Sequence, residues 1–177
     1  YRHPIPDKEG EGMTTVEIIQ KTKAAWGSIR DGDAESKNRI LSAMADSLEA
    51  NTADILRCNS ADMADAQGHI SDVMLDRLRL DESRIAAMAE GIRATVKLPD
   101  HTGRILSEIR HANGMTIYKK QVPLGLVAII YESRPNVTSD AAALTIKSGN
   151  VCVLRSGREA IRTSTAIVKA LKAGIVQ

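Results

Sequence analysis

A continuous apolar run, Leu124–Tyr131, leads directly into a polar and conformationally restricted segment, Glu132–Asn136. Such a run is typical of a strand that is buried on both faces of a parallel sheet. A second apolar run, Val151–Leu154, follows after a segment with helical character. Together the two runs predict a β-α-β unit with parallel strands and a right-handed crossover. Ligands of open α/β sheets bind where such strands end, so the polar residues there are the first candidates for a site.

The helix between these strands has its own start and stop signals. Thr138 or Ser139 can cap its beginning, and Gly149-Asn150 is typical of a left-handed C-terminal cap. After Arg155–Glu159, apolar residues at helical spacing predict a further helix. Two parallel strands make a small sheet for so many helices, and we therefore expect further sequence beyond Gln177.

Helical spacing of apolar residues dominates the chain before residue 105. The residues expected to cap these helices are Thr14, Asp33, Asn51, Ser60, Ser71 and Asp81. The first two caps predict helices over 15–30 and 34–49, and the next two predict a pair of shorter pieces that end near Gly68. The last two predict a short helix and then a longer one, which Pro99 stops. These helices cannot bury their apolar faces alone, so they must form a layer against other elements.

Alternating apolar residues over 105–122 predict a β-hairpin, in which Asn113-Gly114 supplies a tight type I′ turn. Its strands would have free edges, so we expect the hairpin to pair with another subunit; a surface hairpin of the same chain is the alternative. The predicted fold is α/β, with a helical layer (13–104), an oligomerisation-type hairpin and the start of a doubly wound parallel sheet (123–177). Residues 1–12 are expected to be a disordered tail or residues left by cloning.

Composition excludes several classes of protein. Hydrophobic residues at 43% and charged residues at 26% describe a soluble globular chain. A net charge of +2 and 2% aromatic residues leave neither a strongly basic face nor base-stacking platforms, so nucleic-acid binding is disfavoured. No segment approaches the roughly 20 apolar residues of a membrane span. Cys58 and Cys152 are too few for a disulfide scaffold or a zinc site, and we expect a reducing, cytoplasmic location.

The residues after the second strand could contact a nucleotide. Ser156-Gly157 lies between Arg155 and Arg158, so a glycine backbone and two cations could meet a ribose or a phosphate. A strand-helix turn with solvated charges explains the same residues equally well. The chain contains neither a G-x-G-x-x-G fingerprint nor a Walker loop, so the pattern alone does not identify a nucleotide site.

Asn136 follows Arg134-Pro135, and the proline restricts the backbone before it. A rigid amide at this place could donate to an oxyanion, although an asparagine that satisfies its own turn at a helix start is the simpler interpretation. Arg134 could bind a carboxylate or merely neutralise Glu132. The histidines do not have metal-ligand spacing, and no metal site is predicted.

Several motifs point to one family. They are Val122–Gly125, Ile130–Val137, Asp140–Leu144, Lys147–Asn150 and Leu154–Ala160, with Asp76–Leu78, Arg84–Gly91 and Gly103-Arg104 upstream. These motifs closely resemble those of the gamma-glutamyl phosphate reductases, a family within the aldehyde dehydrogenase superfamily. The resemblance covers nearly everything from Met13 onward, and it implies a Rossmann-like cofactor domain of the aldehyde dehydrogenase type.

The resemblance implies the NADPH-dependent reduction of L-glutamyl 5-phosphate to L-glutamate 5-semialdehyde with release of phosphate, a step of proline biosynthesis. In this family a cysteine thiolate attacks the acyl phosphate, and hydride from NADPH then reduces the thioester. Asn136 matches the asparagine that helps to hold the oxyanion, and Arg134 is placed at the substrate. The residues that the resemblance places at NADPH are Tyr131, Glu132, Ser133, Arg155, Ser156, Gly157 and Glu159.

The chain departs from the family in what it lacks. The nucleophilic cysteine of the family lies downstream of Gln177, and neither Cys58 nor Cys152 matches it. The resemblance therefore implies that the catalytic domain is absent, and we expect no reductase activity from this polypeptide by itself. Two alternatives stay open, namely a non-catalytic nucleotide-binding or interaction module and an aldehyde dehydrogenase relative with another small-molecule substrate.

Overall fold

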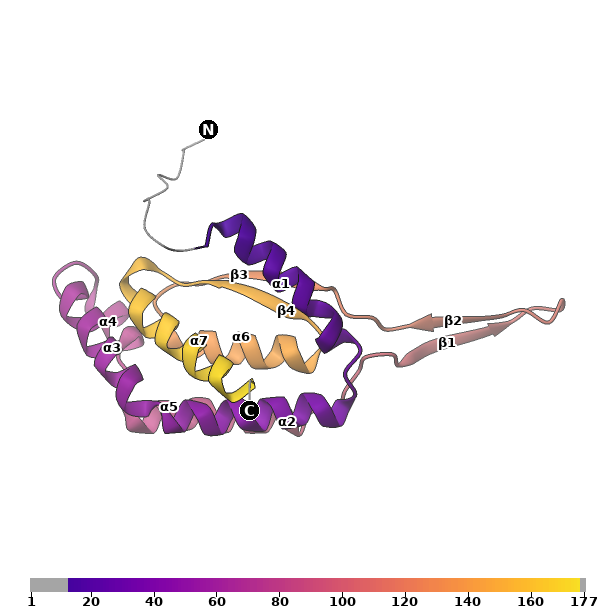
Figure 1. Cartoon of the computed structure of the whole chain (residues 1–177), viewed down its shortest axis with the longest axis horizontal. Helices are drawn as coiled ribbons and strands as arrows, with labels where there is room; N and C mark the ends of the chain where they lie inside the picture. The colour runs from indigo at the N-terminus through magenta and orange to yellow at the C-terminus, as the bar shows by residue number, and fades with distance from the viewer. Residues whose placement is uncertain (1–12, 176–177) are drawn as a thin grey trace, which may run out of the picture.

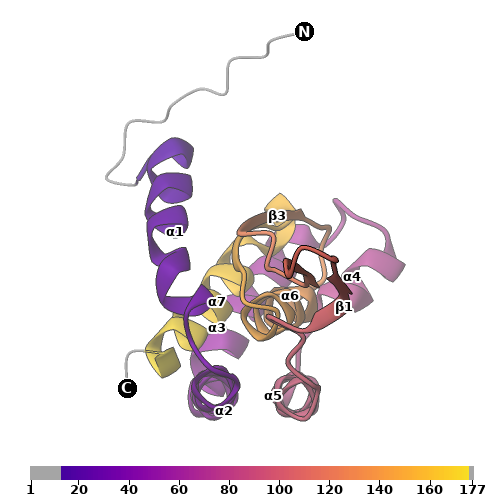
Figure 2. The ribbon, with the colours of Figure 1, turned by 90° about the vertical axis from the view of Figure 1, so that its right-hand side faces the viewer.

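The computed structural model describes residues 13–175 and has an α/β architecture, as the sequence predicts (Figure 1). Its elements are α1 (Thr15–Arg30), α2 (Ala34–Ala50), α3 (Thr52–Ala66), α4 (Asp72–Leu78), α5 (Glu82–Val96), β1 (Ile105–Arg110), β2 (Thr116–Lys120), β3 (Leu126–Ile130), α6 (Pro135–Lys147), β4 (Val151–Arg155), the 3-10 turn η1 (Arg158–Ala160) and α7 (Ile161–Ile175). Strands β3 and β4 form one layer, α6 and α7 the next, and α2 and α5 lie on the far side (Figures 1 and 2).

Side-chain caps start most of the N-terminal helices where they were predicted. The capping side chains, each of which accepts a hydrogen bond from a backbone amide of the first turn, belong to Thr14, Asp33, Ser71 and Asp81. The predicted break within α3 is wrong, since this helix is continuous. Ser60 Oγ donates to Leu56 O inside the helix, and Asn51 Nδ2 donates to Ser47 O of the preceding helix. Both side chains donate to nearby backbone carbonyl oxygens and therefore do not cap a helix.

Helix α6 begins at Pro135, earlier than the predicted caps Thr138 and Ser139. Proline suits a first helical turn because its φ angle is already helical and its missing N–H would have no intrahelical partner there. Thr138 and Ser139 are instead buried within the helix, where Ser139 Oγ donates to Asn136 O at 2.8 Å. Asn136 therefore lies in the first turn of α6 and not in a rigid turn before it.

Strands β3 and β4 pair in parallel, with Leu126 opposite Val151 and Ile130 opposite Arg155. This pairing confirms the predicted β-α-β unit. The prediction that β3 is buried on both faces is wrong, because 79% of Ile130 is exposed, and so is 87% of Leu124 just before the strand. Helix α6 covers one face, whereas α1 packs mainly on β4 and leaves part of β3 open.

The main core lies among α2, α5, α6 and α7. Its fully buried apolar side chains include Leu41, Met44, Leu48, Ile85, Ile92 and Ile167. The first five lie on α2 and α5 at helical spacing, as predicted for the apolar faces of the helices that Asp33 and Asp81 cap. Within the described residues, no helix has the length and apolar character needed to cross a membrane.

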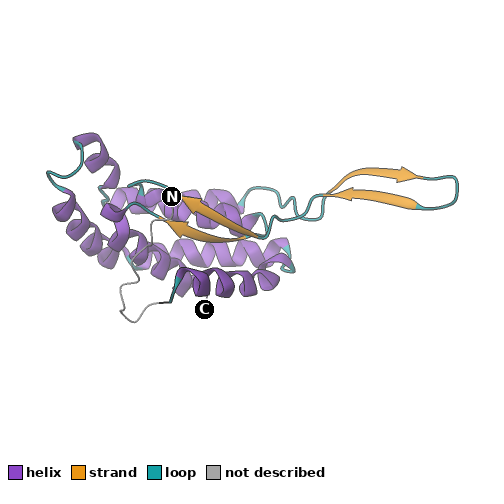
Figure 3. Cartoon of the chain, turned by 90° about the horizontal axis from the view of Figure 1, so that it is seen from above, coloured by secondary structure: helices purple, strands orange, loops and turns teal. Residues whose placement is uncertain are grey.

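Strands β1 and β2 pair as an antiparallel hairpin that projects away from the helical body (Figures 1 and 3). The hairpin is confirmed, but its predicted type I′ turn is wrong. That turn needs a positive φ at both central residues, and among residues 13–175 only glycines have one. Instead, Gly114, with φ of +86°, donates its N–H to His111 O at 3.0 Å, and Asn113 Oδ1 accepts from Met115 N.

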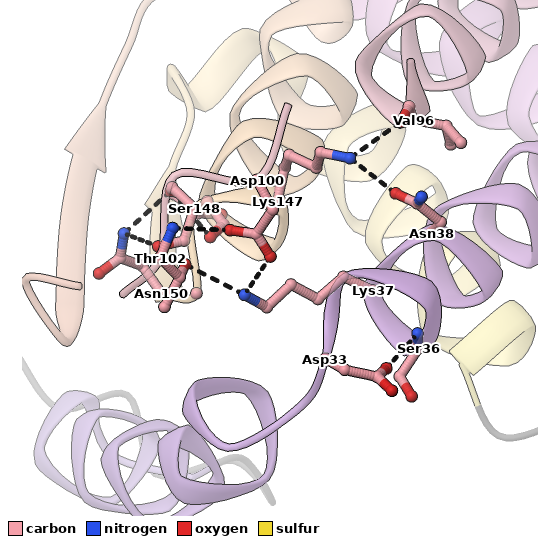
Figure 4. A network of polar contacts seen from close by, with 12 residues as sticks. Asp33, Ser36, Lys37, Asn38, Val96, Asp100, Thr102, Lys147, Ser148 and Asn150 are labelled. Atoms are coloured by element: carbon pink, nitrogen blue, oxygen red, sulfur yellow. Dashed lines mark hydrogen bonds and ion pairs between the residues drawn. The ribbon is translucent and has the colours of Figure 1, made fainter. Parts of the chain in front are cut away.

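A buried ion pair holds the base of the hairpin to α2 (Figure 4). Lys37 is only 1% exposed, and its Nζ donates to Asp100 Oδ2 at 2.9 Å and to Thr102 Oγ1 at 3.1 Å. Burial opposes ionisation of Asp100, but the hydrogen bonds from Lys37 and Thr102 outweigh it and keep the pKa of the Asp100 carboxyl below its usual value. Removing one partner would leave the other charge buried without compensation.

Residues 147–150, here called the α6 C-terminal turn, end α6 with the predicted left-handed cap. Gly149 has φ of +76° and donates its N–H to Ile146 O, while Asn150 N donates to Thr145 O. These two bonds define a Schellman motif. Trp26 Nε1 donates to Gly149 O at 3.0 Å, so the same turn also anchors α1.

The side chains of the α6 C-terminal turn contact three other parts of the fold, and Figure 4 shows the two contacts that Lys147 makes. Lys147 Nζ donates to Asn38 Oδ1 of α2 at 2.7 Å and to Val96 O of α5 at 2.8 Å. Asn150 Oδ1 accepts from Gly125 N at 2.8 Å, just before β3 begins. The turn thus joins the sheet to the helical layer by buried polar contacts, each of which would be costly to leave unpaired.

The close packing at Gly149 yields a test. A Cβ at this position would lie 2.8 Å from Pro123 Cγ, whereas a Cβ at Gly68, which has nearly the same φ of +78°, would meet nothing within 4 Å. We expect Gly68→Ala to lower the free energy of unfolding by about 1–2 kcal/mol, the backbone penalty alone. Gly149→Ala should cost about 1–3 kcal/mol more because overpacking is added. Equal losses in urea titrations of the two variants would contradict this packing.

Candidate functional site

The carboxyl ends of β3 and β4 meet at one edge of the sheet. Tyr131 N donates to Arg155 O at 3.0 Å and so extends the pairing by one residue beyond β3. The segments that follow, 132–136 and 156–159, therefore start side by side. Ligands of open α/β sheets bind at such an edge.

Ser133 and Glu159 join these two segments. Ser133 is 1% exposed, and its Oγ donates a short hydrogen bond to Glu159 Oε1. This bond, with a smaller contribution from a backbone amide, keeps the pKa of the Glu159 carboxyl below its usual value. A Cβ on Gly157 would lie 2.5 Å from Glu159 Oε1, so a side chain there would displace the Glu159 carboxylate from its present position.

Arg155 and Arg158 are exposed beside this pair, and neither makes an ion pair with a carboxylate in the described part of the chain. Free guanidinium groups, a serine hydroxyl at Ser156 and the bare backbone of Gly157 form a donor set that fits a phosphate or a ribose. Glu132 is exposed as well. We call this group of residues, Glu132, Ser133 and Arg155–Glu159, the strand-edge cluster.

Tyr131, which was also predicted at the cofactor, has its side chain on the α6 side of β3. Its hydroxyl shares a 2.7 Å hydrogen bond with Thr138 Oγ1, so the side chain is held against α6. Thr138 is fully buried. The tyrosine therefore ties β3 to α6, and its hydroxyl is already engaged.

Arg134 and Asn136 open into a different space, a pocket of about 510 Å³ between α6 and the α4–α5 region, here called the α5–α6 pocket. Arg134 is the N-cap residue of α6 and is exposed. Asn136 is exposed too, and within the described residues its side chain makes one hydrogen bond, a long one of 3.4 Å from Nδ2 to Asp140 Oδ2. Its amide is thus available to a ligand in the pocket.

Asp140 is a pocket residue that the sequence analysis missed as a site. It is half-buried beside α5. Its Oδ1 lies so near Gly91 that a Cβ added to this glycine would be 3.6 Å away. Burial raises the pKa of the Asp140 carboxyl, and the Asn136 hydrogen bond opposes this only in part. The pairing of positions 136 and 140 is the i, i+4 spacing of a helix, a signal that appears only when α6 begins at Pro135.

The opposite wall of the pocket carries Arg77, Arg79 and Arg84, which the sequence analysis also missed as site residues. Arg84 Nη1 donates to the carbonyl oxygens of Asp76 and Arg79, both at 2.7 Å, and Nη2 contacts Asp76 Oδ1 at 3.2 Å. These bonds hold the Arg84 guanidinium in place. The pocket therefore has a strongly cationic wall.

Among the described residues, neither cysteine is hydrogen-bonded to a histidine or another basic side chain. Cys152 lies in β4, where burial raises the pKa of its thiol against a smaller opposing effect of Thr145. Cys58 is half-buried in α3. Between residues 13 and 175, no cluster of three or more potential metal ligands occurs.

The fold is that of an aldehyde dehydrogenase. The aldehyde dehydrogenase family model matches residues 8–176, and the chain belongs to this family, which uses a nicotinamide cofactor. Within the family, the chain is 57% identical over 163 residues to a gamma-glutamyl phosphate reductase of Streptococcus pneumoniae serotype 19F (strain G54). That alignment covers 92% of this chain and 39% of the relative. It confirms the resemblance on which the sequence analysis relied.

Two solved structures have the same architecture. The gamma-glutamyl phosphate reductase of Thermotoga maritima superposes with a TM-score of 0.88 at 32% identity, over 91% of this chain and 39% of its own. The enzyme of the same name from Saccharomyces cerevisiae gives a TM-score of 0.83 at 30% identity, over 94% of this chain and 43% of its own. The chain thus spans less than half the length of these similar proteins.

The Ser133–Glu159 hydrogen bond can be tested by titration. Because the Ser133 hydroxyl stabilises the ionised carboxylate, Ser133→Ala should raise the pKa of Glu159 towards its ordinary value. The carboxyl ¹³C chemical shift of Glu159 followed against pH reports this change. Ser156→Ala, which removes a neighbouring hydroxyl that makes no hydrogen bond to Glu159, is the control and should leave the pKa of Glu159 unchanged. A Glu159 pKa that does not respond to Ser133→Ala would contradict the contact.

Proposed function

We propose that the chain is the N-terminal part of an NADPH-dependent reductase that converts L-glutamyl 5-phosphate to L-glutamate 5-semialdehyde and phosphate, a step of proline biosynthesis. The observation that carries this proposal is the 57% identity to a gamma-glutamyl phosphate reductase across 92% of the chain. Identity of this order, together with the same fold in two reductases, makes a shared substrate the simplest explanation.

In this proposal the strand-edge cluster holds NADPH. Arg155, Ser156 and Gly157 contact the phosphate and ribose groups, and Glu159, held by Ser133, accepts from a ribose hydroxyl. The exposed guanidinium of Arg155 and the bare backbone of Gly157 support this assignment. When bound, the nicotinamide supplies the hydride for the reduction.

Asn136 is proposed to stabilise the oxyanion that develops on the substrate acyl group. Its side chain is exposed to the α5–α6 pocket, and its place in the first turn of α6 fixes the backbone from which the amide is presented. An oxyanion donor of this kind typically contributes about 3–4 kcal/mol to transition-state stabilisation. Arg134, which lines the same pocket, is proposed to contact the substrate.

The hairpin is proposed to join copies of the chain into a homo-oligomer. Apolar side chains on both strands are about half exposed, including those of Ile105, Leu106, Ile109, Ile117 and Tyr118. Projecting strands with exposed apolar residues are typical of surfaces that pair with another chain. We also propose a cytoplasmic location, which the free thiols of Cys58 and Cys152 support.

The assay is made with the full-length protein that carries this chain, in the direction that consumes L-glutamate 5-semialdehyde, phosphate and NADP. We expect turnover, and we expect Asn136→Ala to lower kcat about 100- to 1,000-fold while the Kd for NADPH stays within about twofold. Asn51→Ala, a change at an asparagine remote from both groups of residues, is the control and should keep wild-type kcat. NADPH binding without any turnover would favour a non-catalytic nucleotide-binding module. Turnover with other semialdehydes only would favour an aldehyde dehydrogenase with another substrate.

The 177-residue chain by itself should show no turnover in the same assay, because neither Cys58 nor Cys152 matches the nucleophilic cysteine of the family. Activity of this chain that survives Cys152→Ser would contradict the proposal that the nucleophile lies outside it.

A further inference from the structure

The charge of Asp140 is not compensated within the α5–α6 pocket. Its carboxylate is half-buried, yet no Lys or Arg of residues 13–175 lies within 4 Å of it. Its one side-chain partner is the Asn136 amide, at the long distance of 3.4 Å. A carboxylate that is partly removed from water without a cation is costly. The pocket therefore offers an unpaired acceptor for a positively charged group.

Most arginines of the pocket also lack a partner of opposite charge. Arg77, Arg79 and Arg134 make no ion pair with a carboxylate of the described chain, and only Arg84 is matched, by Asp76. These three guanidinium groups line the same space as Asp140 but do not reach it. The pocket thus contains guanidinium groups and a carboxylate that are not paired with one another, which suits a ligand that carries both charges.

An α-amino acid has this pair of charges on adjacent groups. Its ammonium can donate to a carboxylate, and its carboxylate can accept two parallel hydrogen bonds from a guanidinium. The other end of such a ligand can reach Asn136, which lines the same pocket.

We propose that the α5–α6 pocket recognises the α-amino-acid end of the glutamyl substrate. Asp140 accepts from the α-ammonium, and the unpaired arginines of the pocket, Arg134 among them, bind the α-carboxylate. The acyl group of the same molecule then lies beside Asn136. Asp140 is thus a specificity-determining residue, since it selects substrates that carry the ammonium. This assignment rests on the proposed function, of which it explains the choice of substrate.

The test uses binding alone and needs no turnover. The 177-residue chain, labelled with ¹⁵N and ¹³C, is titrated with L-glutamate, with glutarate, which lacks the ammonium, and with 4-aminobutyrate, which lacks the α-carboxylate. L-Glutamate should bind at least about tenfold more tightly than either analogue, because each analogue leaves one side of the pocket unpaired. The signals that shift should include the Asp140 carboxyl and the Arg134 guanidinium.

A matched pair of variants isolates the carboxylate. Asp140→Asn keeps the shape of the side chain and removes its charge, so glutamate should bind this variant no more tightly than glutarate does. Asp72→Asn is the control. Asp72 lies outside the pocket, is exposed and makes no ion pair among the described residues, so this variant should keep the wild-type preference. A loss of preference in both variants would point to a general electrostatic effect and overturn the role of Asp140.

Two further results would overturn the proposal. If glutarate or inorganic phosphate binds the wild-type chain as tightly as glutamate, the pocket is an adventitious anion site only. If glutamate causes no shift up to its solubility limit, the pocket does not bind amino acids. Either outcome leaves the proposed reductase activity standing if the full-length protein turns over. Conversely, a glutamate preference without turnover would keep this pocket assignment and overturn the proposed function.

Discussion

The α6 C-terminal turn, residues 147–150, is the junction on which the rest of the structure depends. Lys147 connects it to α2 and α5, the Gly149 carbonyl accepts from Trp26 of α1, and Asn150 receives the Gly125 amide at the start of β3. These partners are far apart in sequence, and the turn contacts all of them. Each bond satisfies a polar group in a part-buried or buried place, so the loss of one would leave a desolvated group unpaired.

This junction explains why the candidate site has two parts. Because the starts of β3 and β4 are held together by Asn150, their ends are in register, and Tyr131 meets Arg155 at the strand edge. Helix α6 runs from the same turn back to its first turn, where Asn136 faces the α5–α6 pocket. One β-α-β unit therefore presents both the strand-edge cluster and the start of α6, the two places where we propose that the nucleotide and the substrate bind.

Local signals predicted much of the fold, because caps such as Thr14 and Asp33 act on amides three residues away. The same logic failed at Asn51, whose side chain reached a carbonyl of the preceding helix. The pocket could not be predicted from one segment, since Asp140 is defined by burial against α5. The family resemblance identified Asn136, but neither Asp140 nor the arginines opposite it had a local pattern that distinguished them from ordinary helix charges.

Native-state hydrogen exchange of Asn150→Ala tests the central claim, that one turn holds the sheet and the helical layer together. The variant removes the acceptor of the buried Gly125 amide, which should cost about 1–3 kcal/mol. If the turn is the common junction, the slowest amides of β3, α2 and α5 should all lose protection by the same free energy. Loss confined to Gly125 and its neighbours, with α2 and α5 unchanged, would contradict the account.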